Sequence, residues 1–297
     1  MNMKEKLRGV FAPITTPFRE DGKVDYEGLK KNMQKYAVSR MQGYLVLGSN
    51  GENKSLSNEE KLQVLKVTME NKAPKQMVMA GCIFESTIET IEYARKFEEL
   101  GVDFITLLPP SYFAKMMTDA VLIKYFTDVA SAVNTPCLVY CAPQFSAGVV
   151  ISLNVIKEIS KHPNIVGMKD SSTGNIDNYL MAVDDEFAVM AGSANFFFNS
   201  VLMGSTGGVI SLANAFPEIA VQHYEYAFKN DLDKGIELNK KILRLNKAVS
   251  GKGGVAGVKA AMDLAGFVGG APRLPLLPLK QEDIEGLKKI LENEGML

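Results

Sequence analysis

The chain contains no tryptophan, and only two histidines and three cysteines occur among its 297 residues. His162 and His223 have no second ligand at a spacing typical of metal sites, so no metal centre is expected and both are interpreted as structural. The three cysteines (Cys82, Cys137 and Cys141) lie in apolar runs, which indicates reduced, buried thiols rather than a disulfide framework. Any chemistry must therefore come from lysine, tyrosine, serine, threonine and asparagine side chains and from backbone groups.

The chain also lacks an excess of charge of either sign and lacks a long uncharged apolar run. Lys plus Arg is 33 and Asp plus Glu is 34, so no net charge directs it to nucleic acid or to a membrane surface. No stretch reaches the uncharged length that a membrane span needs, and the charged residues 1–8 are not followed by the apolar core of a signal peptide. With a hydrophobic content of 46%, these features predict a soluble, cytoplasmic globular protein.

What the sequence does contain is a regular alternation of short apolar runs and amphipathic segments. Apolar rather than alternating strands indicate a parallel sheet covered by helices. The pattern and the length predict a closed (β/α)8 TIM barrel; an open doubly wound sheet is the alternative, weakened because no GxGxxG follows the first strand. The candidate strands are residues 9–17, 43–49, 76–82, 103–110, 136–142, 165–171, 187–193 and 207–214. The candidate helices are residues 26–39, 58–72, 87–100, 119–133, 153–161, 176–183, 194–203 and 217–229.

After residue 230 the pattern is purely helical. Candidate helices cover residues 231–249, 255–264 and 281–291, and the proline-rich residues 272–278 interrupt them. We therefore expect a catalytic barrel over residues 1–230 and a C-terminal helical extension, residues 231–297, packed on it.

The sixth candidate strand ends in a lysine, Lys169, and then turns polar. Desolvation at a strand tip would lower the pKa of the amine and free it to form a Schiff base with a ketone. Tyr140 ends the preceding strand, and neighbouring parallel strands lie about 4.8 Å apart, so a phenol could shuttle protons beside the amine. Taken singly, each has a simpler explanation: a lysine that reaches water and an aromatic ring that caps the barrel.

Two further segments carry weaker signals. The turn Gly48-Ser49-Asn50-Gly51 follows the second strand and offers backbone donors that could hold a carboxylate, although a plain tight turn explains it equally well. Tyr112 lies in the loop after Pro109-Pro110, where packing on the surface would suffice.

Together these strand tips resemble those of the dihydrodipicolinate synthase/N-acetylneuraminate lyase family of class I, Schiff-base-forming lyases. The resemblance runs from about residue 9 to residue 279. Its most specific elements are Gly48-Ser49-Asn50-Gly51-Glu52, Tyr140-x-x-Pro143 and Gly167-Met168-Lys169-Asp170-Ser171. Ala191-Gly192-Ser193, Gly207-Gly208-Val209 and Arg273-x-Pro275-Leu276 add support.

The resemblance implies roles for individual residues. Lys169 would form a Schiff base with pyruvate or another 2-oxo acid, and Tyr140 would relay protons. Ser49 would belong to a hydroxyl pair that binds the keto-acid carboxylate. Tyr112 would reach across a dimer interface into the neighbouring site.

The resemblance also implies a substrate pocket, an assembly and a cofactor requirement. The backbone at Gly192 and at Ile210 would line the pocket. Family members are commonly homotetramers built as dimers of dimers, and they need no cofactor.

Within the family the sequence looks most like 4-hydroxy-2-oxoglutarate aldolase. Gly-Ser-Asn-Gly-Glu replaces the more usual Gly-Thr-Thr-Gly-Glu, and residues 162–171 are close to the corresponding segment of that aldolase. In that subfamily Asn50 and Ser171 would hold the second carboxylate of the substrate. The implied reaction is reversible cleavage of 4-hydroxy-2-oxoglutarate to pyruvate and the aldehyde glyoxylate.

Two departures leave other functions open. Dihydrodipicolinate synthases usually carry an arginine shortly after the Tyr-x-x-Pro segment, and residues 143–148 contain none. This loop is also one residue longer than in either relative. The alternatives are a dihydrodipicolinate synthase that condenses pyruvate with aspartate semialdehyde, a 2-keto-3-deoxy sugar acid aldolase or dehydratase, and a catalytically inactive protein that binds a keto acid.

Overall fold

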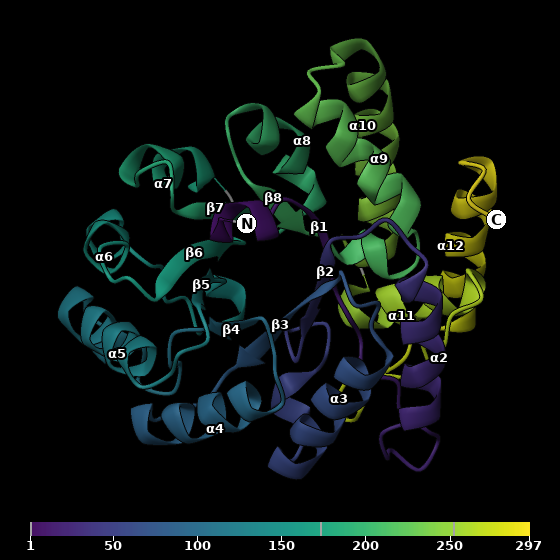
Figure 1. Ribbon diagram of the computed structural model, residues 1–297. Helices are drawn as coiled ribbons and strands as arrows, with labels where there is room; N and C mark the ends of the chain where they lie inside the picture. Colours follow the sequence, from purple (N-terminus) through teal and green to yellow (C-terminus); the bar gives the residue numbers. More distant parts are fainter. Residues whose placement is uncertain (1, 173, 252) are drawn as a thin grey trace.

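A computed structural model describes residues 2–172, 174–251 and 253–297 of the chain. Within these ranges, eight parallel strands form one closed barrel in sequence order, and β8 pairs with β1 to close it. The predicted (β/α)8 barrel is therefore confirmed (Figure 1). The strands are β1 (Gly9–Pro13), β2 (Gly43–Val46), β3 (Met77–Cys82), β4 (Phe104–Leu107), β5 (Cys137–Cys141), β6 (Ile165–Asp170), β7 (Ala188–Ala191) and β8 (Gly207–Val209).

An outer ring of helices covers the barrel, as Figure 1 shows. Side chains that cap the helix N-termini explain where several of them begin. Ser57 and Glu60 form the reciprocal capping box that their spacing favours. The ring consists of α2 (Tyr26–Ala37), α3 (Asn58–Asn71), α4 (Thr87–Glu99), α5 (Asp119–Ser131), α6 (Leu153–Ile159), α7 (Ile176–Ala182), α8 (Ala194–Leu202) and α9 (Pro217–Phe228).

Several strands end earlier than the sequence predicts, because polar groups at their tips form other bonds. The candidate strand 207–214 stops at Val209, and Ser211–Asn214 form the short 3₁₀ helix η4. Asn214 holds this turn against the first strand through hydrogen bonds from its Nδ2 to the Pro13 and Ser211 carbonyl oxygens, each at 3.0 Å. The strand tips are therefore loops and 3₁₀ turns (η1 Asn53–Ser55, η2 Ala114–Met116, η3 Pro143–Phe145).

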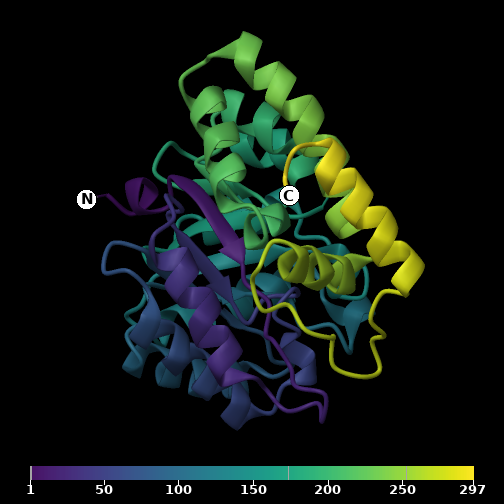
Figure 2. The same cartoon turned by 90° about the vertical axis from the view of Figure 1, so that its right-hand side faces the viewer.

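The C-terminal region packs against one side of the barrel (Figure 2). α10 (Leu232–Asn246) contacts α8 and α9, α11 (Gly254–Leu264) contacts η4, and α12 (Gln281–Asn293) contacts α11. The predicted helix 231–249 is not continuous in the α form, since a π-helical turn, η5 (Lys247–Gly251), follows α10. Residues 272–278 are non-helical, as their prolines predict.

The barrel interior is filled at its N-terminal end. Leu7, at the end of the short helix α1 (Met3–Lys6), packs with inward side chains that include Phe11, Phe104 and Met190. A larger core lies between the strands and the helical ring. Packing thus closes one end of the barrel and leaves the end with the strand C-termini for a site.

The structure also tests the predictions about the cysteines, about His223 and about membrane spans. All three cysteines are buried and free, as predicted. His223 is buried, stacks on Phe198 and meets Asn239 through its Nε2 atom, which agrees with a structural role. None of the helices in the described ranges combines the length and apolar character that a membrane span requires.

The close spacing of strands at Gly43 gives a test of the barrel geometry. A Cβ atom at this position would lie 2.0 Å from the Met77 carbonyl oxygen, whereas one at Gly286 in α12 would meet nothing within 4 Å. We expect Gly43→Ala to lower the free energy of unfolding by more than about 3 kcal/mol, because backbone must move. The control, Gly286→Ala, should raise it by about 0.5–1 kcal/mol. Urea denaturation measures both, and a Gly43→Ala protein as stable as wild type would contradict this packing.

Candidate active site

Lys169 and Tyr140 lie side by side at the mouth of the barrel. They are register partners on the neighbouring strands β6 and β5, so their side chains emerge on the same face. The Lys169 Nζ atom lies 4.0 Å from the centre of the Tyr140 ring. Lys169 is 5% exposed and Tyr140 is 2% exposed. The amine and phenol that the sequence places on consecutive strand tips are thus together and shielded from bulk water.

The acidity of the Tyr140 phenol reflects this neighbour. Burial alone would raise its pKa, but the Lys169 charge and interactions with the Ser49, Lys169 and Ser171 side chains outweigh burial and set the pKa below its usual value. A phenol in this setting gives up its proton more readily than a free tyrosine does. The arrangement is suited to proton transfer at an atom bonded to Lys169.

A cavity of about 480 Å³ opens above this pair. Its polar wall carries hydroxyl and amide groups from Ser49, Asn50, Ser171, Ser193, Ser211 and Ser250. Its other wall is apolar and includes Phe145, Val255, Leu276 and Leu277. Among the described residues that line the cavity, Lys169 is the only cation. A compact anionic ligand in this cavity could therefore meet this amine and several neutral donors.

The turn that carries Ser49 and Asn50 is held from both sides. The Gly51 N–H donates to the Gly48 carbonyl at 3.1 Å, and the Glu52 N–H donates to the Ser49 carbonyl at 3.1 Å. Thr16 on the neighbouring tip donates its hydroxyl to the Gly51 carbonyl at 2.8 Å. Asn50 donates from Nδ2 to the Ser211 hydroxyl at 2.9 Å. The turn thus presents Ser49 and Asn50 to the cavity in a defined orientation.

Gly192 and Ser171 meet in the lining of the cavity. A Cβ atom at Gly192 would lie 1.9 Å from the Ser171 Oγ atom, so a larger residue would displace this hydroxyl. Asp170, the last residue of β6, immediately precedes Ser171 and is fully buried. Its carboxylate accepts hydrogen bonds from the Ser172 N–H at 2.9 Å and the Ser172 hydroxyl at 2.5 Å. Burial raises the pKa of the Asp170 carboxyl. These contacts fix the loop that presents Ser171.

Two of the predicted site residues, Tyr112 and Ile210, do not line the cavity of their own chain. Tyr112 is 82% exposed and packs edge-on against Phe113, outside the cavity of its own chain. Ile210 is buried and does not line the cavity, and its carbonyl accepts the Ala213 N–H at 3.0 Å because η4 begins here. The neighbouring Ser211 takes the place in the wall that was expected for Ile210.

The sequence analysis missed part of the cavity wall. Ser193 ends the predicted strand 187–193, and Ser211 lies in the last part of the predicted strand 207–214, so their places near strand tips could have identified them. Ser250, Gly253 and Val255 come from the C-terminal region, where a helical pattern gives no sign of a site. Ser250 is fixed by hydrogen bonds from its hydroxyl to the Asn246 carbonyl at 3.1 Å and to the Asn246 side-chain oxygen at 2.9 Å.

Comparison with known proteins places this chain in a family. The profile of the dihydrodipicolinate synthetase family matches residues 6–294. A relative from Methanospirillum hungatei, named 4-hydroxy-tetrahydrodipicolinate synthase, is 33% identical over 290 residues, which cover 96% of this chain and 98% of the relative. A relative of the same name from Methanosphaerula palustris is 33% identical over 292 residues, covering 96% of this chain and 98% of the relative.

Solved structures agree with the relatives. The dihydrodipicolinate synthase of Acinetobacter baumannii, determined with pyruvate, has a TM-score of 0.92 at 28% identity and covers 98% of this chain and 100% of that chain. The enzyme of Thermotoga maritima has a TM-score of 0.92 at 26% identity, covering 98% and 99%.

The relatives named here are synthases, so these names do not support the predicted closeness to 4-hydroxy-2-oxoglutarate aldolase. The coarser prediction of the family is confirmed. By its sequence, its barrel and its paired lysine and tyrosine, this chain belongs to the dihydrodipicolinate synthetase family of pyruvate-dependent Schiff-base lyases.

Proposed function

We propose that this protein joins pyruvate to an aldehyde, or cleaves the corresponding product, through a Schiff base on Lys169. The observation that carries the proposal is the shielded Lys169 Nζ atom, 4.0 Å from the Tyr140 ring centre at the mouth of the barrel. A lysine without this phenol would lack a nearby group to move protons, and a lysine in bulk water would lack the cavity.

The chemistry follows from the two side chains. The unprotonated Lys169 amine adds to the keto carbon, and the carbinolamine loses water with a proton supplied by Tyr140. The resulting protonated imine withdraws electrons from C3, so the Tyr140 phenolate takes a C3 proton and leaves an enamine. The enamine attacks the aldehyde carbonyl, and Tyr140 returns the proton to the new C4 oxygen. In the reverse direction the C3–C4 bond breaks, and Tyr140 takes the proton of the C4 hydroxyl. Tyr140 then returns this proton to C3 of the enamine, and water adds to the restored imine and releases pyruvate from the lysine.

The polar wall accounts for binding of the keto acid. Ser49 lies on the same rim as Tyr140 and interacts with its phenol. A carboxylate beside Lys169 would meet the Ser49 hydroxyl and the donors of its turn. Gly192, whose N–H donates to the Asp170 carbonyl at 2.6 Å, also lines the cavity, at a point where a side chain would displace the Ser171 hydroxyl.

Two aldehyde partners are candidates. The names of the relatives support the synthase reaction, condensation of pyruvate with aspartate semialdehyde, better than they support the aldolase reaction. One structural observation favours the aldolase reaction with glyoxylate: Asn50 and Ser171 both line the cavity, and no arginine is among its described lining residues. A 2-keto-3-deoxy sugar acid would also find hydroxyl partners on this wall.

The tetramer predicted from the sequence remains part of the proposal. Tyr112, Phe113 and Met116 are 82%, 66% and 65% exposed on one loop, an apolar group that a second copy would cover. Tyr112 would then reach the site of the neighbouring subunit, in keeping with its absence from the cavity of its own chain.

A panel of aldehydes tests the choice of partner. Each aldehyde is incubated with pyruvate and the enzyme, and pyruvate consumption is followed. We expect aspartate semialdehyde or glyoxylate to be consumed at least about tenfold faster than acetaldehyde, because both offer a carboxylate to the polar wall. Turnover with aspartate semialdehyde alone would exclude the aldolase, and equal rates with all three aldehydes would contradict carboxylate recognition.

Replacement of Lys169 tests the Schiff base itself. Wild-type protein treated with pyruvate and borohydride should gain one reduced pyruvate adduct on Lys169, measured by mass spectrometry of the intact chain and its peptides. Lys169→Ala should lose the adduct and turnover while keeping its circular dichroism spectrum. Lys161→Ala, which removes an exposed lysine, is the control. A folded wild type without an adduct would favour a catalytically inactive keto-acid-binding protein.

Replacement of Tyr140 tests the proton relay. Tyr140→Phe keeps the ring beneath Lys169 and removes the hydroxyl, so we expect turnover to fall by about 10²–10⁴-fold, typical of losing a general acid–base group. Trapping of pyruvate should still occur, more slowly. Steady-state rates with the preferred aldehyde measure the effect, and a rate within twofold of wild type would remove Tyr140 from the mechanism.

A further inference from the structure

The turn that presents Ser49 and Asn50 ends in a residue with an unusual backbone. Glu52 adopts the left-handed conformation, with φ 53° and ψ 41°, although it is not glycine, and it is 5% exposed. Leu47, just before the turn, is also left-handed, with φ 59°. Non-glycine residues keep this conformation where surrounding contacts determine it. The contacts of Glu52 therefore decide the shape of the turn.

Both oxygens of the Glu52 carboxylate are held by the C-terminal region. Lys259 in α11 places its Nζ atom 2.6 Å from one oxygen, and the Arg273 N–H donates to the other at 2.8 Å. The Lys259 and Glu52 side chains are 0% and 1% exposed. Lys259 also donates to the Ala271 carbonyl at 3.0 Å and lies 4.4 Å from the centre of the Phe18 ring. The pair is fully enclosed, and neither charge has access to water.

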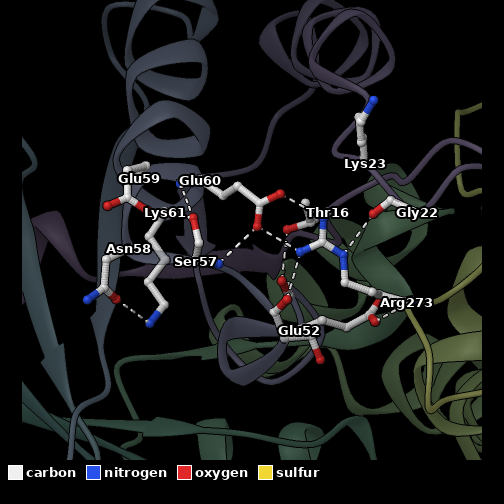
Figure 3. Close-up of polar contacts among 12 residues, drawn as sticks. Thr16, Gly22, Lys23, Glu52, Ser57, Asn58, Glu59, Glu60, Lys61 and Arg273 are labelled. Carbon is white, nitrogen blue, oxygen red and sulfur yellow. Dashed lines mark hydrogen bonds and ion pairs between the residues drawn. The ribbon is translucent and has the colours of Figure 1, made fainter.

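Arg273 is in turn anchored to the barrel. Its guanidinium donates two hydrogen bonds to the Glu60 carboxylate in α3, both at 2.7 Å, and one to the Ser55 carbonyl at 2.7 Å. A further bond, at 2.8 Å, reaches the Gly22 carbonyl. Figure 3 shows the Arg273 side chain extended between Glu60 and Gly22, with Glu52 close by. Arg273 therefore links the loop after β2, α3 and the C-terminal segment at one point.

We propose that Lys259 and Arg273 position the substrate: by clamping Glu52, they hold Ser49 and Asn50 in the orientation that binds the carboxylate of the 2-oxo acid. The inference rests on the proposed function and extends it to residues outside the cavity, since neither Lys259 nor Arg273 lines it. Lys259 and Arg273 are positioning residues. Their loss should weaken binding of the keto acid and leave the reaction at Lys169 nearly intact.

The charges of Lys259 and Glu52 stabilise each other in the interior. Burial lowers the pKa of Lys259, and the Glu52 carboxylate opposes that effect. Each charge depends on the other, so a single replacement would leave an unpaired ion in the interior and could prevent folding. The informative variant is the double replacement Glu52→Gln with Lys259→Met, which removes both charges, keeps similar volumes and retains an acceptor for the Arg273 N–H.

The test measures borohydride trapping across a range of pyruvate concentrations. For the double variant we expect the half-saturating concentration to rise by about tenfold or more. The trapping rate at saturation should stay within about twofold of wild type, because the variant affects binding rather than chemistry. The matched control is Glu294→Gln with Arg244→Met, which removes an ion pair between an exposed arginine and a half-buried glutamate in the same C-terminal region. The control should match wild type in both quantities.

Hydrogen exchange at the amides of residues 48–53 gives a second measurement that needs no substrate. These amides should exchange faster in the double variant than in wild type, and at the wild-type rate in the control. A folded double variant with wild-type half-saturation and wild-type exchange would overturn the inference, as would a loss of trapping rate at saturating pyruvate. If wild-type protein traps no pyruvate, the proposed function fails, and the exchange measurement still decides whether the clamp shapes the turn.

Discussion

The register between β5 and β6 is the constraint on which the site depends. It pairs Tyr140 with Lys169, so the spacing of two strands sets the distance between phenol and amine. A shift of one residue would turn one of the two side chains towards the helical ring and separate them. Neighbouring residues hold the loops around this pair. Gly192 leaves room for Ser171, and Asp170 fixes the loop after β6. Thr16 fixes the turn after β2 by a hydrogen bond to Gly51.

Much of the fold could be predicted because the barrel repeats one pattern. Apolar strands, amphipathic helices and capping boxes such as Ser57 with Glu60 are local signals, and the order of strands in a parallel barrel then places Lys169 beside Tyr140. Strand ends were predicted less well, because the turn at Ser211–Asn214 depends on a contact between Asn214 and the distant Pro13.

The long-range contacts could not be read from the sequence at all. In the sequence, Lys259 looks like any charged residue of a helix. None of the residues near it in the sequence indicates that Glu52 will be its partner. The same holds for the contribution of Ser250, Gly253 and Val255 to the cavity wall. The barrel strands place Lys169 and Tyr140, whereas the C-terminal region forms part of the cavity wall around them. Family membership can therefore be predicted from local motifs, but the choice of substrate cannot.

The plug of side chains around Leu7 at the N-terminal end of the barrel also bears on the order of events. In the described part of the chain, Lys169 is approached through the mouth where the strands end. A ligand bonded to this lysine lies below that mouth, so an aldehyde reaches it from above. The architecture thus favours an ordered reaction: the keto acid binds before the aldehyde in condensation, and the aldehyde leaves before pyruvate in cleavage.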